Sequence, residues 1–200
     1  QKLALYSDMA KIVCGEIIVA DLGISRERFE SPADTYLVEP ADRELPLRKN
    51  RAVHKGKFGH TAVLCGDKSG AAILAASAAM SFGSGLTSLV NAAKLSDSLG
   101  SGSDLAQFKI SPSLMLSDSI PKKATCLVAG SGFSEFSKQA ADIILNWFNS
   151  SKNPAVVIDA GMLTSPETPP FLDALNSVEN ARIILTPHLS ELNRLLEVCG

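Results

Sequence analysis

Four short segments of the chain carry the residue types that could bind or transform a ligand, and each follows a run of apolar residues. They are 66–70 (GDKSG), 130–132 (GSG), 159–161 (DAG) and 186–191 (TPHLSE). Glycines provide turns and close backbone approach, whereas carboxylate and imidazole groups provide ligand contacts and proton transfer. Their clustering after apolar runs is more informative than any one of the motifs.

The glycine-containing segments have two interpretations. The segment 66–70 precedes a helical pattern, so its backbone N–H groups could cradle an anion, or it could be a plain tight turn. The same alternatives apply to 130–132. The segment 130–132 is not a dinucleotide fingerprint, since Glu135 occupies the place of the third glycine, and it lacks the Gly-Lys-Ser/Thr ending of a phosphate-binding P-loop.

The ionisable groups also have two interpretations each. Asp159 ends a predicted buried strand, where its carboxylate either points toward a ligand or caps a turn. His188 follows Pro187 and precedes Glu191 by three residues, so the ring either contacts a ligand or has a structural role. No GxSxG, HExxH or paired Cys/His motif accompanies them.

The elements that must position these groups alternate between short apolar strands and helices. The predicted strands are 61–65, 86–90, 125–129, 155–158 and 182–185, and the predicted helices are 71–82, 136–148 and one that starts near Ser190. This alternation predicts parallel βαβ units in an open α/β layer, with ligands bound beyond the carboxyl ends of the strands. Before them we expect a buried strand at 17–20 and a proline-bearing connector.

Composition narrows the class of protein. The 200-residue chain is 46% hydrophobic and has 19 basic and 21 acidic residues, so it lacks the basic footprint of a nucleic-acid or anionic-membrane binder. No apolar run reaches the roughly 18 residues of a membrane-spanning helix. The cysteines, which lie far apart, are predicted to be buried, reduced thiols of a cytoplasmic protein without a metal site. They are Cys14, Cys65, Cys126 and Cys199.

Five segments, in one order, resemble the NAD(P)H-hydrate dehydratase family. They are the string ending HKGKFGH at 54–60, GAAILA at 70–75 with GSGL at 83–86, GSG at 130–132, VIDAG at 157–161 and LTPHLSE at 185–191. In addition, 15–24 (GEIIVADLGI) looks like the last strand of an NAD(P)H-hydrate epimerase domain. The resemblance implies a slice of a bifunctional protein: an epimerase tail at 1–30, a linker at 31–50, and the N-terminal part of the dehydratase domain at 51–200.

The family resemblance implies a ribokinase-like α/β fold, here a partial domain, and a lyase that repairs hydrated NADH or NADPH with ADP or ATP and Mg²⁺. Hydroxide leaves poorly, so the hydroxyl is phosphorylated before elimination. By motif, the residues expected to bind the substrate are Gly70, Ala71, Gly132 and His188, with Asp159 and Glu191 in supporting roles. The resemblance also implies a homo-oligomer, a tetramer.

The chain departs from the family pattern in two loops. Ser131 and Phe133 replace proline and leucine of a GPGL loop, and Leu189-Ser190 replaces Pro-Gly. The catalytic aspartate, expected in a GTGD loop, lies beyond Gly200, so we expect the fragment alone to be inactive. Two alternatives stay open: a small-molecule kinase of the same fold, and a non-catalytic nucleotide-binding module if the downstream GTGD segment is absent.

Overall fold

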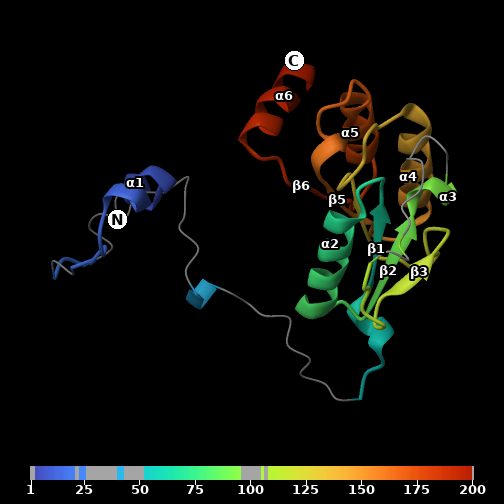
Figure 1. Cartoon of the computed structure of the whole chain (residues 1–200), viewed down its shortest axis with the longest axis horizontal. Helices are drawn as coiled ribbons and strands as arrows, with labels where there is room; N and C mark the ends of the chain where they lie inside the picture. Colours follow the sequence, from blue (N-terminus) through green and yellow to red (C-terminus); the bar gives the residue numbers. More distant parts are fainter. Residues whose placement is uncertain are drawn as a thin grey trace. The chain divides into compact units, whose positions relative to one another are not determined.

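The computed structural model describes residues 3–20, 23–25, 40–42, 52–95, 105 and 108–199. The chain divides into two compact units, Gln1–Leu45 and Pro46–Gly200. The second unit contains the whole sheet and its helices (Figure 1). It therefore also contains every residue that the sequence singles out for chemistry.

The described part of the first unit is helical and then extended. It contains η1 (Leu3–Tyr6), α1 (Asp8–Val13) and η3 (Pro40–Asp42). Ser7 caps α1 by accepting the Ala10 N–H at 3.2 Å. The prediction of a buried strand at 17–20 is wrong: this segment forms no strand, and Ile18 is 79% exposed. A strand needs a neighbour for its backbone N–H and C=O groups, and the described residues of this unit supply none.

The second unit is built on a six-stranded parallel sheet. The strands are β1 (His60–Cys65), β2 (Leu86–Asn91), β3 (Met115–Ser117), β4 (Cys126–Ala129), β5 (Ala155–Ile158) and β6 (Arg182–Leu185). Their order is β3-β2-β1-β4-β5-β6, and every neighbouring pair is parallel. The prediction of an open parallel α/β layer is confirmed.

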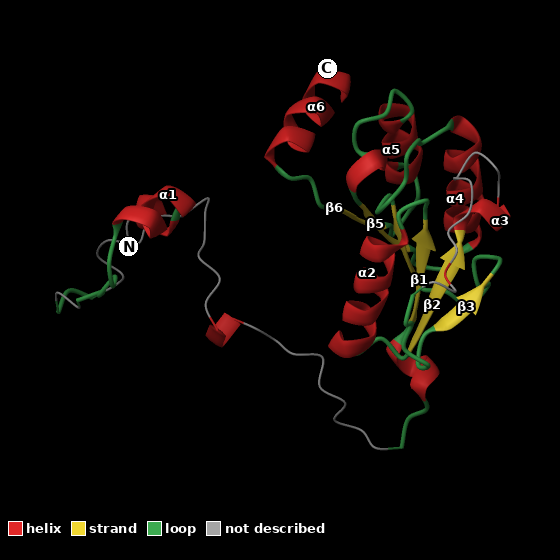
Figure 2. Cartoon of the chain, in the orientation of Figure 1, coloured by secondary structure: helices red, strands yellow, loops and turns green. Residues whose placement is uncertain are grey.

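Helices cover both faces of this sheet (Figure 2). The main ones are α2 (Ser69–Phe82) on one face and α4 (Lys138–Ser150) and α5 (Thr168–Asn176) on the other. The unit also contains η4 (Lys55–Phe58), α3 (Ala92–Leu95), η7 (Ala160–Met162) and α6 (Leu189–Cys199). Successive strand residues point to opposite faces. Val63 accordingly packs with α2, whereas Leu64 packs with α4 and α5. Among the described residues, no helix is long and apolar enough to cross a membrane.

Among the elements that differ from the sequence prediction, three have a clear physical reason. β3 was not predicted because it is a three-residue edge strand, with Leu116 61% exposed. α5 was not predicted because prolines occupy its first turn, where a helix tolerates them. α4 begins at Lys138 and not at 136, because the Ser137 hydroxyl accepts the Ala140 N–H at 3.2 Å and so fixes the helix start.

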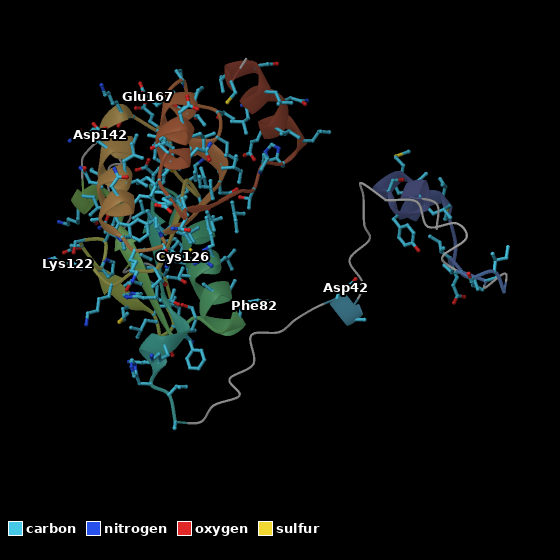
Figure 3. The ribbon with its side chains drawn as sticks, turned by 180° about the vertical axis from the view of Figure 1, so that it is seen from behind. Asp42, Phe82, Lys122, Cys126, Asp142 and Glu167 are labelled. Atoms are coloured by element: carbon cyan, nitrogen blue, oxygen red, sulfur yellow. The ribbon has the colours of Figure 1, made fainter. Side chains whose placement is uncertain are left out.

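The four cysteines, all among the described residues, form no disulfide and lie in different surroundings. Cys65 is buried, Cys14 and Cys126 are half-buried, and Cys199 is exposed, so the prediction that all four are buried is wrong. Cys126 is labelled in Figure 3. Burial raises the pKa of its thiol, although the charge of Arg182 opposes the shift. The raised pKa keeps this thiol protonated and unreactive.

Candidate functional site

The sheet has a topological switch point between β1 and β4. From β1 the chain proceeds outward to β2 and β3, and from β4 it proceeds the other way to β5 and β6. Loops that leave neighbouring strands in opposite directions open a crevice at the carboxyl edge. Here the two loops touch: the Lys68 N–H donates to the Gly132 carbonyl at 3.1 Å. A Cβ on Gly132 would collide with the Lys68 carbonyl, and its φ of 77° favours glycine.

The start of α2 lies beside this contact. Lys68 occupies the N-cap position without a side-chain capping bond, and the first turn has no acidic residue. Gly70 and Ala71 in that turn are exposed, and a Cβ on Gly70 would meet nothing within 4 Å. The first N–H groups of a helix have no intrahelical acceptor, so they can bind an anion. This geometry is compatible with both interpretations of 66–70, an anion cradle and a plain tight turn.

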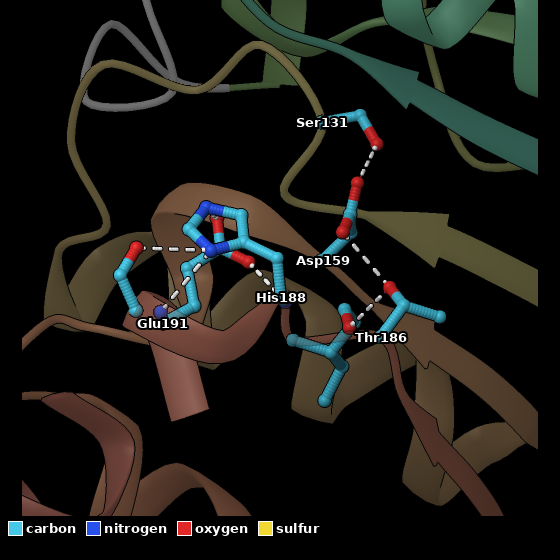
Figure 4. Close-up of polar contacts among 7 residues, drawn as sticks. Ser131, Asp159, Thr186, His188 and Glu191 are labelled. Atoms are coloured by element: carbon cyan, nitrogen blue, oxygen red, sulfur yellow. Dashed lines mark hydrogen bonds and ion pairs between the residues drawn. The ribbon is translucent and has the colours of Figure 1, made fainter. Parts of the chain in front are cut away.

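The Asp159 carboxylate joins the ends of three neighbouring strands (Figure 4). Ser131, after β4, donates its hydroxyl to Oδ2 at 2.8 Å, and Thr186, after β6, donates its hydroxyl to Oδ1 at 2.8 Å. We call these three residues the Asp159 tie. Both carboxylate oxygens accept a hydrogen bond from the protein itself, so the tie fixes the relative positions of the loops that follow β4, β5 and β6.

Close backbone contacts reinforce the tie. Gly130 has a φ of 106°, and a Cβ there would collide with the Asp159 carbonyl. A Cβ on Gly161 would lie 2.7 Å from the Phe133 carbonyl oxygen. The glycines of both loops therefore permit the loops after β4 and β5 to pack against each other.

His188 and Glu191 form the start of α6. The His188 N–H donates to Glu191 Oε2 at 3.0 Å, and the Glu191 N–H donates to His188 Nδ1 at 3.4 Å. This reciprocal pattern is a capping box in which an imidazole replaces the usual hydroxyl. The Ser190 hydroxyl also lies 3.0 Å from Nδ1, and Nε2 lies 3.1 Å from Glu191 Oε1. The His188 side chain remains 66% exposed and accessible to a ligand.

The structure places all six predicted site residues at the carboxyl edge, in separate groups. Gly70 and Ala71 begin α2, Gly132 contacts the preceding loop, Asp159 joins strand ends, and His188 pairs with Glu191. Across the described residues, no hydrogen bond joins the His188 pair to the Asp159 tie.

Sequence reasoning missed the partners of Asp159. Ser131 and Thr186 stand beside Asp159 because Ala129 pairs with Ile158, and Ile158 pairs with Leu185. This strand order was the signal that could have found them.

A pocket of about 330 Å³ adjoins the tie, between the loops after β4 and β5. It is lined by Ser134, Glu135, Phe136, Gly161, Thr164 and Ser165. This pocket has no signature in the sequence, because its lining residues come from two separate loops without a periodic pattern. In the described ranges, no three His, Cys, Asp or Glu side chains converge on a possible metal position.

The chain forms an open parallel α/β sheet, and tightly packed glycine loops lie at its switch point. The Lys68 side chain does not cap the start of α2. This class of protein binds small anionic ligands at its strand ends. Comparison with known proteins identifies the class more closely. A family model described as NAD(P)H-hydrate dehydratase matches residues 61–200. The chain therefore belongs to the NAD(P)H-hydrate dehydratase family, and the resemblance in its motifs is confirmed.

Two relatives cover nearly the whole chain. The bifunctional NAD(P)H-hydrate repair enzyme Nnr of Helicobacter pylori is 34% identical over 199 residues, 100% of this chain and 38% of that protein. The Nnr enzyme of Coxiella burnetii is 30% identical over 203 residues, 98% of this chain and 39% of that protein. The chain thus spans about two fifths of the length of these relatives.

A solved structure shares the fold. The ADP/ATP-dependent NAD(P)H-hydrate dehydratase of Bacillus subtilis, co-crystallized with ATP/Mg²⁺, is 19% identical with a TM-score of 0.52. The match covers 74% of this chain and 51% of that one. This likeness shows the open parallel α/β fold and supports the architecture expected from the sequence.

Proposed function

We propose that the protein containing this chain dehydrates hydrated NADH or NADPH with ADP or ATP as phosphoryl donor, and that it also epimerises the hydrate. The observation that carries the proposal is the family match over 61–200, in which the segments at 70–71, 130–132, 159–161 and 186–191 fall at the carboxyl edge of one parallel sheet. The two relatives that span this chain are both bifunctional repair enzymes by name.

The proposed reaction has two steps. The terminal phosphoryl group of the nucleotide moves to the hydroxyl on the hydrated nicotinamide ring, and the hydroxyl proton is lost. The C–O bond then breaks with its electron pair on the departing phosphate. A proton leaves the neighbouring ring carbon, which restores the double bond. Phosphoryl transfer depends on positioning and charge neutralisation more than on covalent participation of the protein.

The residues of this chain have binding and positioning roles in that proposal. The first-turn N–H groups at Gly70 and Ala71 are available to a phosphate oxygen of the dinucleotide. Gly132 holds its loop against Lys68, and the exposed His188 ring contacts the substrate. Asp159 and Glu191 support these groups through the tie and the capping box.

The described residues do not assemble a magnesium site of their own. Mg²⁺ prefers carboxylates, phosphate oxygens and water in octahedral geometry. Both oxygens of Asp159 accept hydroxyl hydrogen bonds, and Glu191 Oε2 accepts a backbone N–H. We therefore propose Mg²⁺ only as the companion of the nucleotide phosphates and assign it no ligand in this chain.

The wider organisation of the protein is also proposed from the family. Residues 1–30 would be the tail of an epimerase-like domain, 31–50 a linker and 51–200 the first part of the dehydratase domain. We further propose a cytoplasmic homo-oligomer, a tetramer. Apart from Pro40–Asp42, the linker lies outside the described residues.

The test uses the complete gene product that contains this chain. It is mixed with hydrated NADH, Mg²⁺ and either ADP or ATP, and the return of NADH absorbance is followed. Recovery that requires one nucleotide is the expected result, and it identifies the phosphoryl donor. His188→Ala is expected to lower kcat/KM about tenfold or more, because it removes a polar contact to the substrate.

His54→Ala is the matched control, since His54 is an exposed histidine that precedes η4 and β1 at the opposite edge of the sheet. It should leave recovery unchanged. If the folded wild-type protein restores no NADH with either nucleotide, the dehydratase proposal is wrong. The kinase and binding-module alternatives would then take its place.

A further inference from the structure

Some polar side chains at the carboxyl edge have hydrogen-bond partners within the protein, and others do not. Asp159 and Glu191 use their carboxylate oxygens in the tie and the capping box. Ser134, Glu135 and Thr164, which line the adjoining pocket, have no hydrogen bond or ion pair with the described part of the chain. Their donors and acceptors are therefore available to a bound molecule.

The pocket walls are held in place by other contacts. The Ser165 hydroxyl donates to the Phe136 carbonyl at 2.9 Å and so joins the two loops that line the pocket. Phe136 itself is 5% exposed and packs edge-to-face on Phe171, with ring centroids 5.1 Å apart. The pocket therefore has polar side chains without protein partners on loops that other contacts hold in position. A binding site requires this combination.

The chemistry of the lining selects a class of ligand. One carboxylate and two free hydroxyls line the pocket, and no lysine or arginine does. A carboxylate repels a phosphate group, and one carboxylate is too few to hold a divalent cation. Adjacent hydroxyl groups suit this lining, because a carboxylate accepts from both at once; acidic side chains bind ribose in this way in other nucleotide sites.

We infer that this pocket binds the vicinal hydroxyls of a nucleotide ribose, with Glu135 as their acceptor and Thr164 beside it. The inference rests on the proposed function, which places nucleotides at this edge of the sheet. The ribose belongs to the hydrated dinucleotide or to the phosphoryl donor, and kinetic comparison separates these sources. In either case Glu135 determines affinity for that nucleotide and does not take part in the chemical steps.

The test compares wild-type protein with Glu135→Gln, which keeps the shape of the side chain and removes its charge. The KM of the nucleotide that occupies the pocket should rise about tenfold with kcat nearly unchanged, because a charge-assisted hydrogen bond is lost from the bound state. Thr164→Val should raise the same KM about threefold. Glu179→Gln, an exposed carboxylate in the turn before β6, is the matched control.

The substrate whose KM rises identifies the ribose. A rise for hydrated NADH with a smaller rise for hydrated NADPH indicates the adenosine ribose, where Glu135 faces the 2′ position. Equal rises for both hydrates indicate the nicotinamide ribose, and a rise for ADP or ATP alone indicates the donor.

Unchanged KM values for all three nucleotides in folded, active Glu135→Gln protein overturn the ribose pocket and leave the dehydratase proposal standing. If the wild-type protein is inactive, equilibrium binding of NADH and ADP provides the readout. About tenfold weaker binding by Glu135→Gln then supports the pocket, and unchanged binding overturns it.

Discussion

The Asp159 tie and the Glu135 pocket share the loops after β4 and β5 at the carboxyl edge, and the tie also includes Thr186 after β6. In the tie, both carboxylate oxygens accept hydroxyl groups of the protein. In the pocket, the described residues leave the carboxylate of Glu135 without a partner. Two acidic residues on adjacent loops therefore have different functions: Asp159 holds the frame of the site, whereas Glu135 is available to a ligand.

The largest effect on stability is expected at Gly130, which packs directly against the Asp159 backbone. Gly130→Ala should lower the free energy of unfolding by about 3 kcal/mol, because its positive φ is strained for alanine and its Cβ would collide with the Asp159 carbonyl. Urea denaturation measures the change. Gly70→Ala is the matched control and should be neutral or stabilising, since nothing lies within 4 Å of its Cβ.

Removal of the central carboxylate should have the next largest effect. Asp159→Ala is expected to cost about 2 kcal/mol, because it removes the acceptor of the buried Ser131 hydroxyl and leaves the Thr186 hydroxyl only the Ile158 carbonyl, at 3.3 Å. Glu135→Ala should change the unfolding free energy by less than about 0.5 kcal/mol. Equal losses from the two variants would contradict the distinction between tie and pocket.

The capping box gives a smaller effect. Glu191→Ala should lower the unfolding free energy by about 1 kcal/mol, since the His188 N–H loses its acceptor at the start of α6. Glu197→Ala, an exposed position later in the same helix, is the control and should cost little. A similar loss for both variants would show that Glu191 has no special capping role.

His60 is a buried titratable residue at the start of β1, outside both the Asp159 tie and the pocket. Its Nε2 lies 2.8 Å from the Ser88 hydroxyl, and burial lowers its pKa below the ordinary 6.5. As the pH falls through 6.5, the unfolded chain takes up a proton that the folded chain resists, so stability decreases until the folded pKa is passed.

Unfolding measured across this pH range should show that decrease in wild-type protein, and His60→Gln should remove the His60 contribution. An identical pH profile in both proteins would contradict the lowered pKa.

The sequence predicted the parts of the fold that follow from local patterns. β5 and β6 have the predicted bounds because each is a short apolar run between polar turns. The strand at 17–20 failed because apolar composition alone cannot supply a sheet neighbour. Likewise, the position of Asp159 at a strand end was predictable, but its bonds to Ser131 and Thr186 depend on strand order, which is a tertiary property.

His188 and Glu191 also show that sequence spacing alone does not decide the role of a residue. The spacing of His188 and Glu191 allowed both a ligand contact and a structural role, and the structure shows the structural one while leaving the ring exposed. The pocket could not be predicted, because Ser134 and Thr164 lie in separate turns that only the packing of the two loops brings together.

The most direct test of the central claim, that this edge is a frame enclosing a nucleotide site, is a crystal structure of the complete gene product with hydrated NADH and ADP. We predict ligand beside His188 and the start of α2, a ribose hydroxyl within hydrogen-bond distance of Glu135, and the Asp159 tie unchanged. Nucleotides bound away from this edge, or a ligand that displaces Ser131 and Thr186 from Asp159, would contradict it.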